Sequence, residues 1–551
     1  MVCSGVVGAL LAAAFCGTFE AGLGGWTPRN YKDRVVFSVE PCDGRSSVVI
    51  TRNPAVGEQG GSAWELAGEP FPVKSGERLS VTVRARGTVR QMFAPNGFKG
   101  QYMTCMRWYG ADGRELAGRH VGFGLDIEPD AWRYSFARMT APEGAVSARV
   151  VIGADTPSLT RKDRIVIESV TVHSLPPSAS GSQVSLRRDG TVLVDGEPFL
   201  PIGIYGLLKN DFNGHSFERA MRDLKDAGFN TVQRHGVLPV EEFEEFLAAV
   251  DTCGMKTFMM PVDNYAKDIF TEGTVLKYKG HKSILSWYLA DDTSSYAKPE
   301  DVATRMEIVR QLDPYRLTLQ ADAVTLDDRF DRYGKYVHAT DVFLPELYPC
   351  RSRETNGTEV ASVVRDMRIV RRAIRKAGNP VKSVWPIIQH FDGWGWERFP
   401  SFAELRAMSW ESLIHGGRGI VWYTYGARNP KNRGVSADPR RWREITAVSR
   451  EIAAVKADLL TFDAARQPSV DVLSGPSCDA LGQESVSCLL KTGAQPLLIA
   501  ANAATNAVRV RIDVAGYSRV EVLGEDRTLS ADGGLVDVFE SNAVHLYRLK
   551  R

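Results

Sequence analysis

The stretch that decides the fold is LPIGIY (200–205), followed by SFERAMRDLKDAG (216–228) and NTVQ (230–233). The first and last of these segments are short apolar runs of the kind that form buried strands. The middle segment repeats apolar residues at helical spacing and ends in glycine, as helices commonly do. A strand, a helix and a second strand in this order predict a βαβ unit with two parallel strands.

The alternation of strand and helix continues along the chain. The predicted strands are Leu200–Tyr205, Asn230–Gln233, Lys256–Pro261, Ile284–Ala290, Leu317–Gln320, Val342–Leu347, Ser383–Gln389 and Gly419–Thr424. Eight strands, each followed by a crossover, predict a (β/α)8 TIM barrel over residues 184–462. A doubly wound sheet would also alternate, but it does not require eight strands and usually carries a glycine-rich phosphate loop. No GxGxxG or GxxxxGK motif is present.

Both flanks of the predicted barrel are rich in short strands. Residues 18–174 contain β-branched runs separated by Gly, Pro and Asp, which predict an antiparallel β-sandwich of jelly-roll type. Residues 175–183 are rich in serine and proline and predict a linker. Residues 463–551 predict a second, C-terminal β-sandwich. The expected architecture is therefore multidomain, with a sandwich on each side of the barrel.

The composition is that of a folded protein. The chain has 551 residues, 44% hydrophobic and 24% charged, with a formal net charge of +2. This balance excludes a disordered chain and argues against nucleic acid or an anionic membrane as partner. Eight cysteines are too few for a disulfide scaffold, although Cys42 could pair with Cys105, and Cys478 with Cys488. No metal-ligand spacing or nucleotide motif is present, so the sequence implies no cofactor.

The N-terminus carries a run of apolar or small residues, VVGALLAAAF (6–15). The run is too short to span a bilayer but has the length of the hydrophobic region of a signal peptide, although no Lys or Arg precedes it. We therefore expect residues 1–17 to be a signal peptide, cleaved near Cys16–Thr18, and the protein to be secreted or periplasmic. A buried first strand is the alternative. No other segment resembles a membrane-spanning helix.

The active site of such a barrel lies at the carboxyl ends of its strands, so the residues that end or follow each strand are the candidates. Carboxylates there could perform acid/base chemistry, polar groups could bind hydroxyls, and aromatic rings could stack on sugar faces. The candidates are Tyr205, Arg234, His235, Asp263, Asp291, Asp292, Glu346, Tyr348, Gln389, Trp422 and Tyr425, with Asp322 and Asp392 in reserve. Trp394 and Trp396 lie in a glycine-rich loop after the seventh strand and are expected to form a wall of the binding site.

Three segments resemble glycoside hydrolases of the clan A barrel superfamily: DGEPFLPIGIY (195–205), AGFNTV (227–232) and HKSILSWYLADD (281–292). In that superfamily the fourth strand ends in Asn-Glu or Asp-Glu, and the Glu is the general acid/base. The resemblance therefore implies that Asp291 takes the Asn/Asp position and that Asp292 is the acid/base.

The sequence departs from the superfamily at both catalytic positions. The acid/base is an Asp, one methylene shorter than Glu, and the nucleophile position on the seventh strand holds Gln389, whose amide cannot form a covalent intermediate. Glu346, in LPELYP (344–349), is the best candidate for the second carboxylate, either as the base of an inverting pair or as a displaced nucleophile. A structural salt bridge from Glu346 to Arg234 is the alternative.

The first sandwich begins with GTFEAGLGGW (17–26), which resembles the start of jelly-roll carbohydrate-binding modules. Aromatic residues of such a sandwich usually fill its core, but some could stack on sugar rings. The aromatic candidates are Trp26, Trp64, Trp108, Tyr109 and Trp132.

The sequence as a whole predicts an exported glycoside hydrolase that cleaves an oligo- or polysaccharide with two carboxylates. The alternative is a non-catalytic carbohydrate-binding barrel, which the amide of Gln389 supports. On the helix after the sixth strand, Arg371, Arg372 and Arg375 are expected to lie on a solvated outer face.

Overall fold

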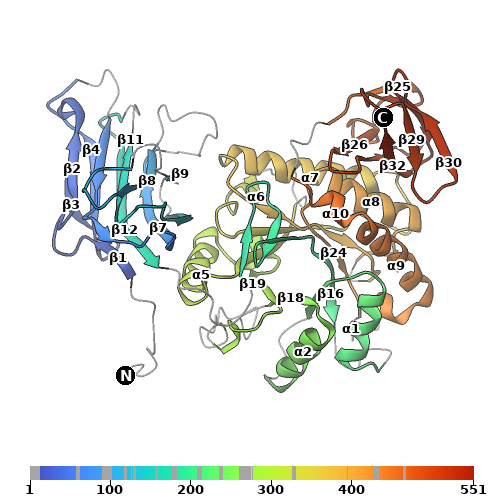
Figure 1. Ribbon diagram of the computed structural model, residues 1–551, viewed down its shortest axis with the longest axis horizontal. Coiled ribbons are helices and arrows are strands. Elements are labelled where there is room, and N and C mark those ends of the chain that lie inside the picture. Colours follow the sequence, from blue (N-terminus) through green and yellow to red (C-terminus); the bar gives the residue numbers. More distant parts are fainter. Residues whose placement is uncertain are drawn as a thin grey trace.

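The computed structural model describes residues 13–57, 63–89, 102–116, 121–125, 127, 129, 132–154, 159–174, 183–207, 214–234, 240–259, 275, 277–324, 331–393, 395–426, 434–462 and 467–551. They form a β-sandwich, a barrel and a second β-sandwich in chain order (Figure 1), which confirms the predicted architecture. Within these ranges no helix is long and apolar enough to cross a membrane.

Two antiparallel sheets form the N-terminal sandwich. Its strands are β1 (Ala13–Thr18), β2 (Thr27–Asn30), β3 (Val35–Cys42), β4 (Arg45–Arg52), β5 (Trp64–Ala67), β6 (Phe71–Pro72), β7 (Arg78–Gly87), β8 (Tyr102–Tyr109), β9 (Val121–Gly124), β10 (Arg133–Thr140), β11 (Ser147–Ala154) and β12 (Arg164–Ser174). One sheet has the order β10-β7-β12-β4-β3, with β1 beside β12, and the other has the order β2-β5-β11-β8-β9, with β6 beside β11. Side chains alternate between the faces of each strand, so that Leu79, Val81, Val83 and Ala85 of β7 all point into the core.

Strand β1 occupies the region where we expected a signal peptide to be cleaved. It pairs with residues 169–173 of β12, and the ring of Phe15 lies 5.6 Å from that of Trp26 and 5.5 Å from that of Phe71. Cys16–Thr18 therefore belongs to a strand that packs on the sandwich, as in the alternative of a buried first strand. Residues 1–12 lie outside the described residues, and export stays a prediction.

The tryptophans of the sandwich are mostly core residues, as their type favours. Trp26, Trp64 and Trp108 are at most 5% exposed. Trp132 is half-buried, and the guanidinium groups of Arg84 and Arg86 lie 4.7 and 4.5 Å from its ring. The three buried rings therefore cannot stack on a sugar, and the interpretation of these three as core residues is confirmed.

Neither of the two possible disulfides is present. Cys42 and Cys105 are free and belong to separate apolar clusters outside the sandwich core, one on each sheet. Because the core lies between them, the two thiols cannot meet. Cys478 is exposed, Cys488 is buried, and both are also free.

The barrel is a closed ring of eight parallel strand positions. Its strands are β16 (Ile202–Leu207), β17 (Thr231–Arg234), β18 (Lys256–Met259), β19 (Ile284–Ala290), β20 (Leu317–Ala323), β21 (Val342–Leu347), β22 (Ser383–Val384), β23 (Ile387–Gln389) and β24 (Ile420–Tyr423). The pairings β16–β24 and β20–β21 close the ring. The seventh position consists of β22 and β23, both paired with β21 and separated at Pro386, which has no N–H for a strand hydrogen bond. The predicted (β/α)8 barrel is confirmed.

The helices between the strands follow the sequence signals. They are α1 (Phe217–Asp226), α2 (Val240–Cys253), α4 (Thr293–Tyr296), α5 (Pro299–Leu312), α6 (Asp331–Gly334), α7 (Glu359–Lys376), α8 (Phe402–Ile414), α9 (Pro439–Ala454) and α10 (Lys456–Leu459). At the start of α1, the Ser216 hydroxyl accepts a hydrogen bond from the Arg219 N–H, and Ser401 and Glu404 form a capping box at the start of α8.

A small sheet covers the end of the barrel where its strands begin. It consists of β13 (Val184–Leu186), β14 (Val192–Val194) and β15 (Glu197–Phe199). Val184 and Val192 share one buried cluster with Leu317 and Val342, which start two barrel strands. A site inside the barrel is therefore expected at the opposite end, where the strands end.

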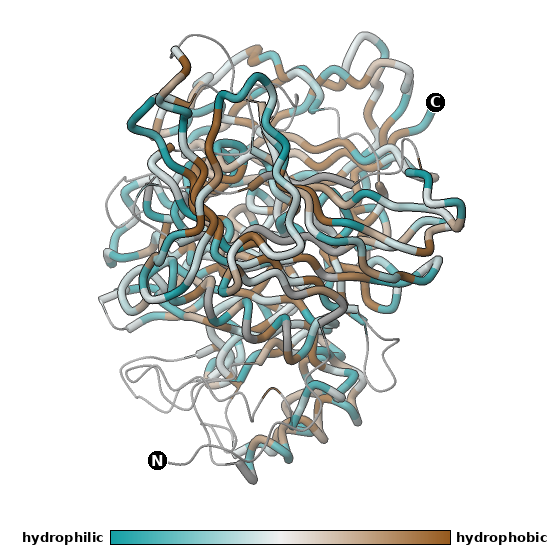
Figure 2. The backbone as a smooth tube through the Cα atoms, turned by 90° about the vertical axis from the view of Figure 1, so that its left-hand side faces the viewer, coloured by the Kyte–Doolittle hydropathy of each residue, from teal (hydrophilic) through white to brown (hydrophobic). Residues whose placement is uncertain are grey.

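The C-terminal sandwich has strands β25 (Val470–Ser474), β26 (Val486–Lys491), β27 (Leu497–Asn502), β28 (Val508–Ile512), β29 (Arg519–Val522), β30 (Arg527–Ser530), β31 (Leu535–Phe539) and β32 (Val544–Lys550). Its sheets have the orders β25-β28-β31 and β26-β27-β32-β29-β30. The Arg406 guanidinium of α8 donates to the Val544 carbonyl at 2.7 Å, and this bond joins the sandwich to the barrel. Along the chain, hydrophobic strand segments alternate with hydrophilic turns (Figure 2).

Candidate active site

Four carboxylates gather at the carboxyl ends of three neighbouring barrel strands. Asp291 and Asp292 follow β19, Asp322 lies near the end of β20, and Glu346 lies near the end of β21. Ala290 is in register with Gln320, and Ala323 with Glu346, so these strand ends lie at one level. The carboxylates therefore form one cluster at the open end of the barrel.

Two tyrosines hold Asp291. The Tyr205 hydroxyl of β16 donates to Oδ2 at 3.2 Å, and the Tyr288 hydroxyl of β19 donates to Oδ1 at 2.5 Å. The register of β19 shifts between Tyr288 and Ala290, which lets Asp291 turn toward the same side as Tyr288. Tyr205 was predicted as a site residue. Tyr288 was not, because strict alternation would place it on the opposite face from Asp291.

Asp292 occupies a left-handed backbone conformation, with φ +44° and ψ +42°. It immediately precedes α4, but its side chain makes no capping hydrogen bond to that helix. Partial burial and, after it, the neighbouring charges of Asp291 and Asp322 together raise the pKa of Asp292 to about 6 against the opposing charge of Arg332.

We expect Asp292→Asn to stabilise the fold at neutral pH. Between pH of about 4 and 6 the unfolded chain releases this proton while the folded chain still binds it, so stability falls as pH rises. Asn also tolerates the left-handed backbone. Thermal melts should give the variant a higher Tm than the wild type at pH 7 but not at about pH 3.5, below both pKa values. The exposed Asp526→Asn serves as control; an equal gain at both pH values would contradict the expectation.

Glu346 is the most strongly shifted carboxyl group of the cluster. Burial raises the pKa of Glu346 well above its usual value, and the charges of Asp291, Asp292 and Asp322 raise it further. Its sequence-based alternative, a salt bridge to Arg234, is wrong: the Arg234 guanidinium lies 5.0 Å from the ring of Phe243 on α2, outside the barrel. The nearby cation is instead Arg332.

Asp322 has a different environment from the other carboxylates. It accepts hydrogen bonds from the Ser294 N–H and hydroxyl at 3.1 and 3.0 Å, and the Arg332 guanidinium lies 3.6 Å away. The side chain is buried, and this burial raises its pKa. Because these contacts tie β20 to α4 and α6, Asp322 supports the cluster and is a poor candidate for direct catalysis.

An aromatic group adjoins the carboxylates. The Tyr348 ring lies 5.1 Å from Phe391, 5.8 Å from Trp396 and 6.0 Å from Tyr423. The indole N–H of Trp396 donates to the Tyr348 carbonyl at 2.8 Å. Tyr348 is thus placed beside the predicted catalytic residues, and half-buried Trp396 belongs to the same aromatic group, as expected for a wall.

Gln389 does not line the site as predicted. It is fully buried, and its amide N–H groups face the carbonyls of Cys350, Phe391 and Arg398 at 3.2–3.3 Å. Its carbonyl accepts from the Cys350 N–H at 2.8 Å. These hydrogen bonds of the Gln389 side chain join the segments after β21 and β23. The prediction of a sugar-binding Gln389 is therefore wrong.

Three further predicted binding residues face away from the barrel interior. Trp422 is fully buried in the layer between strands and helices, where its indole N–H donates to the Ser409 hydroxyl at 3.1 Å. Tyr425 is buried against Trp442 in the same layer. Arg234 lies against α2, as described above. These three predictions are wrong because the side chains point toward the helices.

Several predicted residues lie outside the described residues: His235, Asp263 and Trp394. Asp392 is described and half-buried. Among the residues that the structure describes, no group of His, Cys, Asp and Glu has a metal-binding arrangement.

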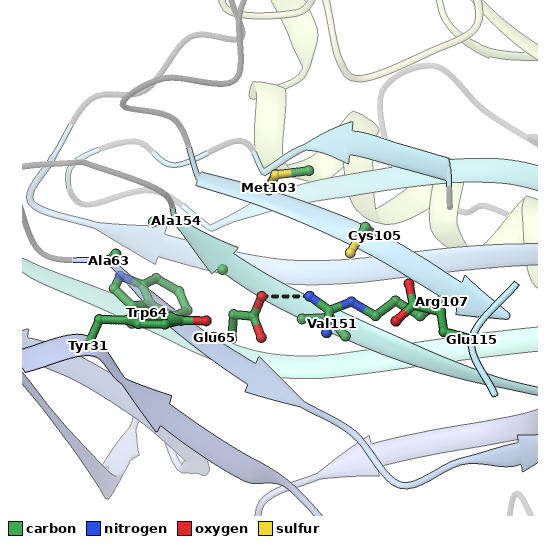
Figure 3. A pocket seen from close by; sticks show the side chains of 11 residues that line it. Tyr31, Ala63, Trp64, Glu65, Met103, Cys105, Arg107, Glu115, Val151 and Ala154 are labelled. Carbon is green, nitrogen blue, oxygen red and sulfur yellow. Dashed lines mark hydrogen bonds and ion pairs between the residues drawn. The ribbon is translucent and has the colours of Figure 1, made fainter. Parts of the chain in front are cut away.

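A separate hollow of about 700 Å³ lies on the outer face of β5, β8 and β11 in the N-terminal sandwich (Figure 3). Arg107 donates to the Glu65 carboxylate at 2.6 Å across this hollow, and Glu115 lies beside Arg107. Tyr31, 51% exposed, lines it as well. Trp64 lines the hollow too but is buried, so the exposed ring is that of Tyr31, which the sequence did not single out.

No protein family model matches the chain, and neither does any curated protein. Among solved structures, a glycoside hydrolase family 5 from Bacteroides vulgatus ATCC 8482 is 14% identical, covers 67% of this chain and 92% of its own, and has a TM-score of 0.46. The endo-beta-1,4-mannanase from Thermotoga petrophila is 12% identical, with coverages of 64% and 91% and a TM-score of 0.36. An FMN-binding beta-glucuronidase from Facaelibacterium prausnitzii L2-6 is 10% identical, with coverages of 94% and 95% and a TM-score of 0.36. These likenesses are distant and concern the fold alone.

Proposed function

We propose that this protein is a glycoside hydrolase that cleaves an oligo- or polysaccharide by two-carboxylate chemistry. The observation that carries the proposal is the pair Asp292 and Glu346, two carboxyl groups with raised pKa values in one cluster at the open end of the barrel. Titratable groups shifted by burial and by each other's charge are characteristic of catalytic sites. The adjoining aromatic group around Tyr348 suits the apolar face of a sugar ring.

Within this pair we assign the proton to Glu346 at neutral pH. Glu346 is the more buried of the two and its pKa is raised further, whereas Asp292 releases its proton near pH 6. Glu346 then protonates the leaving oxygen, and ionised Asp292 is the base or nucleophile. This reverses the roles expected from the resemblance. Asp291, held on both oxygens by tyrosine hydroxyls, positions substrate hydroxyls beside them.

The assignment gives an expected pH profile. Activity should rise as Asp292 ionises near pH 6 and fall at higher pH as Glu346 releases its proton. The measurement is kcat/KM between pH of about 4 and 9, and Asp292→Asn should remove the acid limb together with most activity. An acid limb at the ordinary pKa of an aspartate would contradict the role of Asp292.

The alternative, a carbohydrate-binding barrel without catalysis, rested on Gln389. The Gln389 amide hydrogen-bonds to two loops, so packing is a sufficient reason for an amide at this position. Its presence is therefore not an argument against catalysis. The deciding experiment offers a panel of neutral and acidic oligosaccharides to the wild-type protein and measures both binding and release of reducing ends. Release of reducing ends supports hydrolysis, and binding without release supports the alternative.

The N-terminal sandwich is proposed to bind part of the same saccharide. The ring of Tyr31 can stack on a sugar, and the Glu65–Arg107 pair can exchange hydrogen bonds with its hydroxyls. Export of the protein, to the periplasm or the exterior, remains part of the proposal and is tested by N-terminal sequencing of the mature protein.

A further inference from the structure

A cleft of about 970 Å³ lies between the barrel and the C-terminal sandwich. Its walls come from α7, the segment 414–418 before β24, and the strands β25 and β26. The second half of α7 leads toward β22, and segment 414–418 leads into β24. The cleft is therefore near the end of the barrel where strands begin, away from the carboxylate cluster.

Arginines dominate the charge of this cleft. Arg368, Arg371 and Arg375 follow one another on α7 at spacings of three and four residues, which places them on one helix face. Arg418 approaches from the segment before β24. The two carboxylates in the lining are Glu484, which pairs with Arg368, and Asp471. Four guanidinium groups thus face two carboxylates.

The surroundings of Arg371 disfavour its positive charge. Burial lowers its pKa, and the like charges of Arg418 and Arg375 lower it further. The group that raises the pKa of Arg371 is the phenol of Tyr333 and not a carboxylate. A surface arginine in water would not experience this combination, so the prediction of a solvated outer face does not describe Arg371.

The backbone around the arginines is shaped to hold them. The Arg418 Nε donates to the Asp189 carbonyl at 3.0 Å, which fixes that side chain. Gly416 has φ +102°, and a Cβ there would lie 3.2 Å from Cδ and Nε of Arg371. A glycine at this position therefore permits both the turn and the close passage of Arg371. Attraction to the helix dipole accounts for Arg375 in the last turn of α7 but not for Arg371 one turn earlier.

The described residues around His415 do not form a relay for acyl transfer. Ser487 and Glu411 both approach Nε2 of His415, at 3.0 and 3.4 Å. A catalytic relay needs the hydroxyl and the carboxylate on opposite ring nitrogens.

We propose that this cleft binds an oxyanion group, a sulfate or phosphate ester, with Arg371, Arg375 and Arg418 as its donors. Guanidinium groups donate paired N–H bonds to such oxyanions. No Phe, Tyr or Trp is among the described residues that line the cleft, which disfavours stacking of nucleic-acid bases. The volume exceeds that of one ion and leaves room for sugar rings that carry the ester. The proposal is independent of hydrolysis at the barrel mouth.

The test measures binding by calorimetry with three probes: inorganic phosphate, a sulfated oligosaccharide and its unsulfated counterpart. The wild-type chain should bind the sulfated oligosaccharide more tightly than its unsulfated counterpart, and high salt should weaken this additional binding. Binding of phosphate with equal affinity would identify a free oxyanion as the ligand source. Failure of both phosphate and the sulfated probe to bind would overturn the proposal.

Variants locate the bound probe. Arg371→Met should weaken binding by about 10-fold or more, since hydrogen bonds from a charged group are among the strongest. Arg372→Met, exposed on the same helix and outside the cleft, is the matched control. If Arg371→Met does not fold, exposed Arg375→Met takes its place. Equal weakening by Arg372→Met would show that the probe binds elsewhere.

Discussion

Glu346→Gln should lower kcat/KM on unactivated glycosides by about 10²–10⁴-fold, the usual contribution of a general acid. The substitution removes the carboxyl group whose pKa is raised by burial and by three neighbouring carboxylates. Glycosides with an activated aryl leaving group need little protonation and should lose much less activity. Steady-state kinetics on both substrate types make the comparison, with Glu197→Gln on exposed β15 as control.

The roles of Asp292 and Glu346 are distinguished by how the activity of each variant depends on the leaving group of the substrate. Asp292→Asn should abolish turnover of both substrate types, and azide should restore the activated one if Asp292 is a nucleophile. If instead Glu346→Gln loses both types equally and azide rescues it, the two roles are exchanged. Wild-type activity in Glu346→Gln would remove Glu346 from the mechanism.

Gln389→Glu should destabilise the protein by about 3–5 kcal/mol, the usual cost of an uncompensated buried charge, and should not improve hydrolysis. The Gln389 amide donates toward three backbone carbonyls, and a carboxylate would turn a negative oxygen toward them. This substitution would introduce the nucleophile of the superfamily that the sequence resembles if Gln389 faced the substrate. Urea denaturation and hydrolysis assays provide the two measurements.

Gln389→Met is the matched control for this substitution. It removes the hydrogen bonds at similar size but introduces no charge, so its loss should be smaller, about 1–3 kcal/mol. If the Glu variant were as stable as the wild type, or gained activity, the side chain would have to face the barrel mouth.

The barrel could be predicted from the sequence because its strands are buried on both faces. Such strands appear as continuous apolar runs, and amphipathic helices between them leave a clear alternation. The break between β22 and β23 was not predicted, since a run from Ser383 to Gln389 looks continuous despite Pro386. In the sandwich, Trp26, Trp64 and Trp108 were correctly favoured as core residues by size and burial tendency alone.

The site was harder to predict because a shift of one position along a strand moves a side chain from the barrel interior to the side of the helices. Trp422 points to the helices, whereas its neighbour Tyr423 contacts Tyr205 and Tyr348 at the open end. Both faces of a barrel strand are apolar, so the sequence does not show which residues face the barrel interior and which face the helices. Asp291, Asp292 and Glu346 were placed together because strand order alone determines their proximity.

The left-handed backbone at Asp292 restricts which residues evolution can place there. Asp and Asn are enriched several-fold at positive φ, whereas Glu lacks the short side chain that makes this conformation accessible. Replacing Asp292 by Glu therefore changes the preferred backbone conformation as well as the length of the side chain. Sequence libraries at this position should return Asp, Asn and Gly among folded variants, and Glu should emerge only with a second change that restores an extended backbone.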